Sequence, residues 1–397
     1  MKPLYLDYNA TTPIDPEVLT AMKPYLEEHF GNPSSSHWYG AQTKNAVEKA
    51  RSQVADLLNC RPDEIIFTGS GTESNNCAIK GAAFANADKG NHLIISSIEH
   101  AAVTEVCQYL ETRGFPLSYI PVDETGIVNL SALEKTIMPE TVLISVMHAN
   151  NEVGTIEPIR EITALARKKG IIVHTDAAQS VGKTKTDVEE LGVDLLSIAG
   201  HKLYAPKGIG ALYIRQGMEL EKFMHGAGQE RNMRAGTENV PYIVGLGTAC
   251  EIAKRDLEKN TSHMKTMRDR LFEGLREKLG DIRLNGHPEK SIPNTLSLGF
   301  PNIDATFLLS EMTDVAASAG SACHAGSSSI SGVLGAMGVP QKYAMGTLRL
   351  SVGKMTTEDE IDRAIGSICG AVEHIRISMR YVENHSPFSS DLPVFIS

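Results

Sequence analysis

Two reactive side chains follow apolar runs that have the composition of buried strands. Asp176 follows the run Gly170–Val173, and Lys202 follows the run Asp194–Ile198. A carboxylate at the buried end of a strand is costly unless it faces a cation. A lysine there is a candidate for Schiff-base chemistry, because loss of water lowers its pKa and frees the nucleophilic amine. Taken alone, Asp176 is equally well explained as a helix cap, and a single lysine is more often a solvated surface charge.

Two further strand ends carry groups that suit a phosphorylated ring. In Phe67–Ser74, FTGSGTES, the glycines let the backbone approach an anion, and Thr72 with helix-start N–H groups can hold a phosphate. The alternative for this stretch alone is an ordinary capped glycine turn, and a Walker A loop is excluded because no GK[ST] follows. His100 follows the run His92–Ser96 and could stack on a flat ring and move protons, although a lone histidine is more often structural.

The combination of these groups is more informative than any one of them. Open α/β sheets bind ligands just beyond the carboxyl ends of their strands, and each of these groups follows a strand. A lysine for a Schiff base, an aspartate that keeps a pyridine nitrogen protonated and a helix start that holds a phosphate are what pyridoxal phosphate needs. The sequence therefore predicts a pyridoxal 5′-phosphate site built on Lys202, Asp176 and Thr72, with His100 beside the ring.

The elements that must position these groups alternate between short apolar runs and longer helical patterns from about residue 16 to about residue 255. Several runs are rich in Ile, Val and Leu throughout, as strands buried on both faces should be. Such alternation predicts an α/β fold with a mainly parallel seven-stranded sheet and helices on both faces. We expect strands at 64–68, 92–96, 117–121, 141–147, 170–175, 194–198 and 209–214, and helices at 41–58, 72–86, 103–113 and 160–169.

The pattern changes near residue 250, where residues 250–279 have the pattern of one long charged helix that leaves the first domain. A smaller α+β unit follows, with strands at 295–299 and 347–352 and a closing helix at 358–379. The predicted organisation has four parts: an N-terminal arm (1–15), a large cofactor-binding domain (16–255), a small C-terminal domain (256–380) and a tail (381–397) that is mobile or docked on a partner.

Composition limits the class of protein. The chain has 397 residues, 42% of them hydrophobic and 22% charged, which is typical of a globular protein with a sizeable core. Its 48 acidic and 38 basic residues give a formal charge of −10, which argues against nucleic acid or an anionic membrane as the main partner. There is no 18-residue apolar run and no signal-peptide pattern at the start. Six widely spaced cysteines without a CxxC pair favour free thiols in a reducing, cytoplasmic setting and argue against structural zinc.

Ten short motifs, met in order along the chain, extend this interpretation. They are YLDYNATTP (5–13), GNPSSSH (31–37), TGSGTESNN (68–76), EH (99–100), HANNEVG (148–154), HTDAAQSVGK (174–183), GHKLYAPKGIGALY (200–213), RAGTEN (234–239), SAGSACHAG (318–326) and LRLSVG (348–353). In them the sequence resembles the cysteine desulfurases, fold-type-I pyridoxal phosphate enzymes of the class V aminotransferase family, over roughly residues 3–380. The resemblance implies conversion of L-cysteine to L-alanine with transfer of the sulfur.

The resemblance also implies roles at the cofactor. Lys202 resembles the Schiff-base lysine, Asp176 the partner of the pyridine nitrogen and Gln179 the donor to the phenolic oxygen. His100 resembles the acid/base that stacks on the ring. The expected phosphate contacts are Gly71, Thr72 and His201.

Three more residues are assigned by the resemblance to the substrate and to a second subunit. Asn151 lies where the family contacts both the cofactor oxygen and the substrate. Arg349 resembles the guanidinium that binds the substrate carboxylate, a bidentate task that suits arginine. Thr237 would reach the phosphate of the partner subunit, which implies a homodimer with shared active sites.

Cys323 carries the chemistry that is particular to this family. It lies in the run 318–326, whose small residues favour little regular structure, so that a loop could bring a thiolate into the site. The family places its persulfide cysteine here, and only the thiolate is a competent nucleophile. His324 is not expected to activate it directly, because neighbours on an extended segment point opposite ways. The other five cysteines are expected to pack as small hydrophobes: Cys60, Cys77, Cys107, Cys250 and Cys369.

Two departures from the family keep alternatives open. Ala199 stands where many desulfurases have a serine three positions before the lysine, and His324 with LRLSVG resembles selenocysteine lyases. A selenocysteine lyase is therefore an alternative, and an aminotransferase that does not need Cys323, or a non-catalytic sulfur carrier, are more distant ones. The partners implied are L-cysteine or L-selenocysteine, a second copy of the chain and a sulfur acceptor such as an iron–sulfur scaffold. No resident metal is expected, although Cys323 could contact an iron–sulfur cluster transiently.

Overall fold

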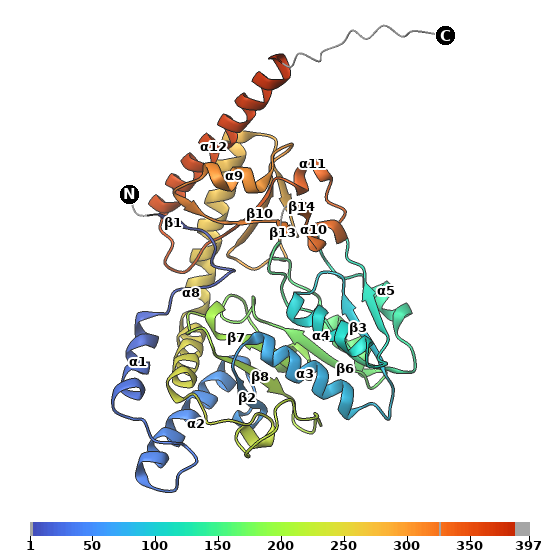
Figure 1. Cartoon of the computed structure of the whole chain (residues 1–397), viewed down its shortest axis with the longest axis vertical. Coiled ribbons are helices and arrows are strands. Elements are labelled where there is room, and N and C mark those ends of the chain that lie inside the picture. The colour runs from blue at the N-terminus through green and yellow to red at the C-terminus, as the bar shows by residue number, and fades with distance from the viewer. Residues whose placement is uncertain (1–2, 325–326, 386–397) are drawn as a thin grey trace.

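A seven-stranded sheet forms the centre of the larger part of the molecule (Figure 1). The computed structural model describes residues 3–324 and 327–385. The strand order is β2-β8-β7-β6-β5-β3-β4, and β8 is antiparallel to both of its neighbours while the other pairs are parallel. The predicted mainly parallel sheet is therefore confirmed. Its strands are β2 (Ile65–Thr68), β3 (His92–Ser96), β4 (Leu117–Ile120), β5 (Thr141–Ser145), β6 (Ile172–Asp176), β7 (Leu195–Ala199) and β8 (Gly210–Ile214).

Helices cover both faces of this sheet, because successive side chains of a buried strand point to opposite sides. On β3, Ile94 packs into the cluster formed with α2 and α6, whereas Leu93 and Ile95 pack into the cluster formed with α3 and α4. The α-helices of this part are α1 (Pro16–Glu27), α2 (Trp38–Leu58), α3 (Gly71–Ala85), α4 (Ala101–Glu111), α5 (Leu130–Thr136), α6 (Ile159–Arg167) and α7 (Val188–Leu191). Three short 3-10 helices accompany them: η1 (Pro62–Glu64), η2 (Gly200–Lys202) and η3 (Glu230–Asn232).

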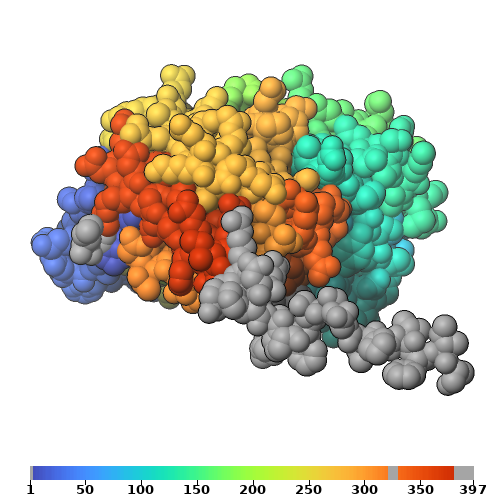
Figure 2. All heavy atoms as spheres, turned by 90° about the horizontal axis from the view of Figure 1, so that it is seen from above, coloured from blue at the N-terminus to red at the C-terminus, as the bar shows by residue number. Residues whose placement is uncertain are grey.

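A second, smaller sheet with order β12-β15-β10-β9 is antiparallel throughout. The N-terminal strand β1 (Leu4–Tyr5) pairs with β11 (Val315–Ala316), so the arm at the start of the chain packs with the C-terminal part. In Figure 2 the orange and red C-terminal residues lie together, beside the teal segment of the larger part. The other elements here are β9 (Arg283–Asn285), β10 (Thr295–Gly299), α9 (Ala305–Glu311), β12 (Ser318–Ala319), α10 (Gly332–Ala336), α11 (Gln341–Ala344), β15 (Thr347–Ser351) and α12 (Glu358–His385).

The helix α8 (Val240–Leu279) connects the two parts and contributes to both hydrophobic clusters, with Ile243 in the first and Met267 in the second. It begins earlier than the predicted residue 250, because Asn239 caps it and a proline lies in its first turn. The four predicted domain limits themselves stay a prediction.

Two local predictions were wrong. The closing helix was predicted to end at residue 379, but α12 continues to His385. Residues 386–397 of the predicted tail lie outside the described residues. The run 318–326 was predicted to lack regular structure, yet β13 (Ser321–His324) pairs with β14 (Ser327–Ile330) in an antiparallel hairpin. Backbone groups can pair in a ladder whatever the size of the side chains, so small residues do not prevent a hairpin. Among the described helices, none is both long and apolar enough to cross a bilayer.

Candidate active site

A cavity of about 410 Å³ opens where the carboxyl ends of β6 and β7 meet the start of α3, the N-terminal arm and β15. This is the edge at which open α/β sheets bind ligands. Most of the predicted site residues line it: Gly71, Thr72, His100, Asn151, Asp176, Gln179, His201, Lys202 and Arg349. The structure thus brings together side chains from segments almost 280 residues apart in the sequence (from Gly71 to Arg349).

Lys202 ends η2, directly after β7, and its amine reaches back to the N-terminal arm. Its Nζ donates to the carbonyl oxygens of Asn9 and, at 2.9 Å, of Ala10. Burial, followed by the positive charge of Arg349, lowers the pKa of Lys202 to about 8. The sequence analysis missed these two carbonyls, because a backbone oxygen gives no residue-type signal. A larger fraction of such an amine is neutral at physiological pH than of a solvated lysine, and only the neutral amine can act as a nucleophile or base.

Asp176 is the last residue of β6, and its carboxylate is buried and held from two sides. Oδ2 accepts a hydrogen bond of 2.7 Å from Asn75 Nδ2, and Oδ1 accepts one of 2.9 Å from the backbone N–H of Ala178. Asn75 was not singled out from the sequence, although it lies one helical turn after Gly71 on the buried face of α3. These contacts hold the carboxylate at the edge of the cavity, where it can face a cationic ring nitrogen.

The start of α3 forms the opposite end of the cavity. Ser70 caps the helix by accepting from the N–H of Glu73 at 3.1 Å, and the first turn of any α-helix has N–H groups without intrahelical partners. A Cβ on Gly71 would stand 3.0 Å from the Cβ of Ala199, so the backbone passes close to β7 here. With the exposed Thr72 hydroxyl, this end has the geometry of an anion site at a helix N-terminus. Ala199 adds a methyl group and no donor.

Two histidines, His100 and His201, flank this end of the cavity. His100 caps α4, and its Nδ1 accepts from the N–H of Ala102 at 3.0 Å, so the neutral ring carries its proton on Nε2. The His201 ring contacts the Thr11 hydroxyl at 3.2 Å. Burial, followed by the charge of Lys202, lowers the pKa of His201 to about 4, so this ring is neutral at physiological pH.

Arg349, in the middle of β15, is fixed by three partners. One terminal nitrogen donates to Asp7 Oδ1 at 2.8 Å and to Ser318 Oγ at 2.9 Å, and the other donates to the carbonyl of Asn151 at 3.2 Å. Its Nε is buried and has no partner among the described residues. A buried donor without a partner is costly, so an anionic group from a ligand would fit here. Sequence reasoning missed both Asp7 and Ser318.

Among the predicted site residues whose side chains the structure describes, Thr237 does not line this cavity. Thr237 is exposed on the segment between η3 and α8. Cys323 lies on β13 opposite Ser328, and His324 lies opposite Ser327. The side chains of Cys323 and His324 fall outside the described residues. The backbone nevertheless links their hairpin to the site, because β12, which carries Ser318, pairs with β15 at Arg349.

The remaining cysteines have environments that disfavour a thiolate. Four of them are buried, and Cys60 is half-buried against the first hydrophobic cluster, so the predicted packing as small hydrophobes is confirmed. Burial raises the pKa of Cys60, Cys77 and Cys107 to about 12 in each case, and raises that of Cys250 and Cys369 as well. None of these five thiols is suited to nucleophilic attack at neutral pH.

Comparison with known proteins agrees with this geometry. The family model "Aminotransferase class-V" matches residues 4–364. The chain belongs to the class-V aminotransferase family. Within the family it is similar to the cysteine desulfurases: cysteine desulfurase IscS of Methanosarcina thermophila is 48% identical over 377 residues, which cover 94% of this chain and 93% of the relative.

Solved structures of class-V relatives confirm the predicted fold class. One named "NIFS-LIKE PROTEIN" has a TM-score of 0.88 and 40% identity, over 94% of this chain and 100% of its own. Another, "SspA in complex with cysteine", has a TM-score of 0.79 and 38% identity, over 89% and 100% of the two chains. These relatives support the cysteine desulfurase prediction rather than the selenocysteine lyase alternative.

Enzymes of the class-V aminotransferase and cysteine desulfurase families depend on pyridoxal phosphate, and the cavity suits that group. A buried carboxylate, a half-buried amine of lowered pKa and a helix N-terminus lie around one space, as a charged pyridine ring with a phosphate requires. Among the side chains that the structure describes, no group of three or more His, Cys, Asp or Glu is arranged to hold a metal ion.

Proposed function

We propose that this chain is a pyridoxal 5′-phosphate-dependent cysteine desulfurase, which converts L-cysteine to L-alanine and takes the sulfur onto Cys323 as a persulfide. The observation that carries the proposal is that Lys202, Asp176 and the N-terminus of α3 border one cavity together with Arg349. The names of the relatives, and the cysteine held by the 38% identical SspA structure, support the substrate.

Residues from both ends of the cavity would hold the cofactor. Lys202 would join it covalently, Asp176 would face its ring nitrogen, and Gln179 would donate to its phenolic oxygen. His100 would stack on the ring, while Gly71, Thr72 and His201 would receive the phosphate. When bound, pyridoxal phosphate supplies a ring that accepts the electron pair left when the substrate loses its α-proton.

Arg349 and Asn151 would orient the substrate. The carboxylate of L-cysteine would take up the unpartnered Nε of Arg349, while Asp7 and Ser318 hold the guanidinium in place. Lys202 would then remove the α-proton, because its lowered pKa leaves a useful fraction of neutral amine at physiological pH. The Nε2–H of His100 is placed to pass a proton inside the cavity.

Sulfur transfer is proposed as the task of the Cys323 thiolate. It would attack the sulfur of the substrate, so that an S–S bond forms and the Cβ–S bond breaks. The electron pair of that bond stays with Cβ, which is then protonated, and alanine leaves. The overall change is L-cysteine plus the enzyme thiol giving L-alanine plus the enzyme persulfide, which needs no added oxidant or reductant. The persulfide would then pass its outer sulfur to an acceptor protein.

The proposed homodimer accounts for the position of Thr237. This residue lies outside the cavity of its own chain, so its predicted phosphate contact would be made in the partner subunit. Exposed aromatic side chains around the start of α2 offer apolar surface for such an interface: Phe30, Trp38 and Tyr39.

The test compares the wild-type protein with Cys323→Ser in the presence of L-cysteine. The wild-type protein should form alanine and a protein-bound persulfide in equal amounts. Cys323→Ser should keep the visible absorption of bound pyridoxal phosphate and lose persulfide formation. Cys77→Ser serves as a control, because a buried thiol of raised pKa has no role in the proposed transfer. Full activity of Cys323→Ser would refute the role of Cys323, and faster turnover of L-selenocysteine alone would favour the lyase.

A further inference from the structure

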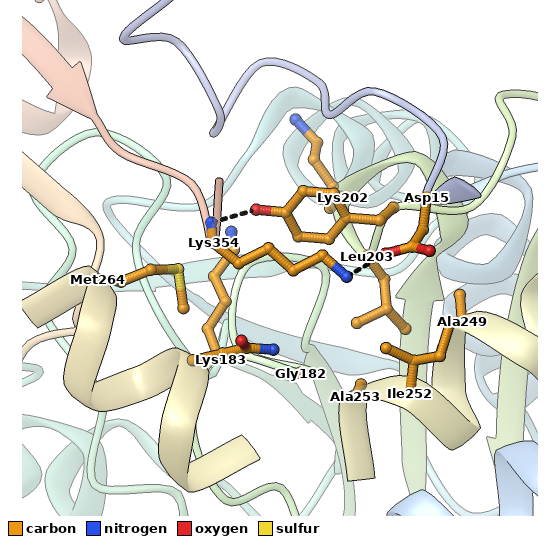
Figure 3. A pocket seen from close by; sticks show the side chains of 12 residues that line it. Asp15, Gly182, Lys183, Lys202, Leu203, Ala249, Ile252, Ala253, Met264 and Lys354 are labelled. Atoms are coloured by element: carbon orange, nitrogen blue, oxygen red, sulfur yellow. Dashed lines mark hydrogen bonds and ion pairs between the residues drawn. The ribbon is translucent and has the colours of Figure 1, made fainter. Parts of the chain in front are cut away.

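Lys183 is a buried lysine that the proposed reaction does not use. It follows β6 by seven positions (176 to 183), and its side chain is only 4% exposed. Figure 3 shows it between Met264 and Lys354, on the side of Lys202 that faces α8. The cavity there measures about 20 Å³, room for one water at most, so no substrate reaches Lys183 from this side.

The amine of Lys183 has one hydrogen-bond partner among the described side chains. Its Nζ donates to Gln179 Oε1 at 2.8 Å, and Gln179 is itself 5% exposed. Burying an ammonium group costs several kcal/mol, so a buried lysine beside a binding site points to a functional task. Lys183 does not line the large cavity, whereas Gln179 does. Any hydrogen-bonded influence of Lys183 on the site therefore passes through Gln179.

The contact fixes the orientation of the Gln179 amide, that is, which of its two terminal atoms, Oε1 or Nε2, faces Lys183. In its ammonium form Lys183 can only donate, and this form selects the orientation with Oε1 toward Lys183. The Nε2 group then lies on the other side, where it donates to the carbonyl of Asn9 at 3.0 Å. Its second hydrogen remains for the cavity. Loss of the Lys183 donor would leave the carbonyl of Asn9 as the only described partner that selects this orientation.

Several charged or titratable groups surround Lys183. Burial, followed by the charges of Lys202 and Arg349, lowers the pKa of Lys183 to about 7. Its charge in turn contributes to the lowered pKa of His201. The small cavity is also lined by Asp15, Tyr204 and Lys354, and Lys354 Nζ is paired with Asp15. The side chains that α8 contributes to this small cavity are all uncharged, and they include Asn260 and Met264.

We propose that Lys183 is a positioning residue that fixes the Gln179 amide with its NH₂ group toward the cavity, and so tunes the protonation of the bound cofactor. This inference rests on the proposed function, because it concerns the phenolic oxygen that Gln179 would contact. A hydrogen-bond donor at the phenolic oxygen favours the deprotonated form of the cofactor's titrating group. Removing Lys183 should therefore raise the pH at which the visible absorption of the holoenzyme changes.

The experiment is a pH titration of the visible absorption of purified holoenzymes. Lys183→Met should raise the midpoint by about one pH unit relative to wild type, the size of shift that one hydrogen bond or nearby charge produces. Lys185→Met is the matched control, since Lys185 is exposed and pairs with Glu190, and its midpoint should equal that of wild type. In a Gln179→Met background, Lys183→Met should add little further shift, because the effect passes through Gln179.

An unchanged midpoint in a folded, cofactor-loaded Lys183→Met protein would overturn the inference while leaving the proposed function intact. An equal shift in the presence and absence of Gln179 would overturn the route through the amide. If Lys183→Met does not fold, Lys183→Leu, which also removes the donor, should raise the midpoint, and an unchanged midpoint would again overturn the inference. A wild-type protein that never shows the absorption of bound pyridoxal phosphate would overturn both proposals.

Discussion

The lowered pKa of Lys202 predicts how fast the cofactor-free protein takes up pyridoxal phosphate at different pH values. Only the neutral amine attacks an aldehyde. With a pKa of about 8 in place of the usual 10.5, about a quarter of the Lys202 amines are neutral at about pH 7.5, against about one in a thousand for a solvated lysine. The structure therefore predicts roughly 240-fold more reactive amine at that pH.

The assay is stopped-flow absorbance after mixing cofactor-free protein with pyridoxal phosphate, between about pH 6.5 and about pH 9.5. The rate of covalent attachment should rise about tenfold per pH unit at the acid end and level off above about pH 8. Arg349→Met should move the midpoint upward, because Arg349 is the second cause of the lowered pKa after burial. Lys202→Ala should show no attachment. A rate that still rises tenfold per unit at about pH 9.5 would refute the argument, since that is the behaviour of an unperturbed lysine.

Three further changes test the structural reasoning. Asn75→Ala should weaken cofactor binding by about 10- to 100-fold in equilibrium dialysis, because a hydrogen bond to a charged carboxylate is worth about 1.5–3 kcal/mol; Asn76→Ala, on the neighbouring position of α3, should have a much smaller effect. Ala199→Ser places a hydroxyl beside Gly71. It should slow the dissociation of the cofactor about fivefold, because one neutral hydrogen bond is worth about 1 kcal/mol. Faster dissociation would contradict the position assigned to the phosphate. Arg51→Met should lower the free energy of unfolding in urea by about 3–5 kcal/mol, because it leaves the buried carboxylate of Glu230 without its cation. The exposed pair of Arg61 and Asp63 supplies the control, with a loss below about 1 kcal/mol for Arg61→Met.

The sequence was sufficient for the features that depend on local pattern. Apolar runs of strand length predicted every strand of the seven-stranded sheet to within two residues at each end, because a strand buried on both faces has to be apolar throughout. Asp176, Lys202 and Thr72 could be identified because each lies at the end of such a run or within four residues after it, and strand ends meet at one edge of a parallel sheet. The beginning of α8 and the end of α12 were less well predicted, because helix ends depend on capping and on packing more than on periodicity.

The tertiary structure alone decided which partners these side chains have. The carbonyls of Asn9 and Ala10 approach Lys202 from a segment more than 190 residues away, and a backbone oxygen is the same in every residue type. Arg349 donates to Asp7 because the N-terminal arm packs over the site. Lys183 is buried and donates to Gln179 because α8 packs on that side of the site. The chain's local pattern determined where reactive groups emerge from the sheet. Their protonation and orientation follow from burial and from contacts between distant segments, which arise only when the chain is folded.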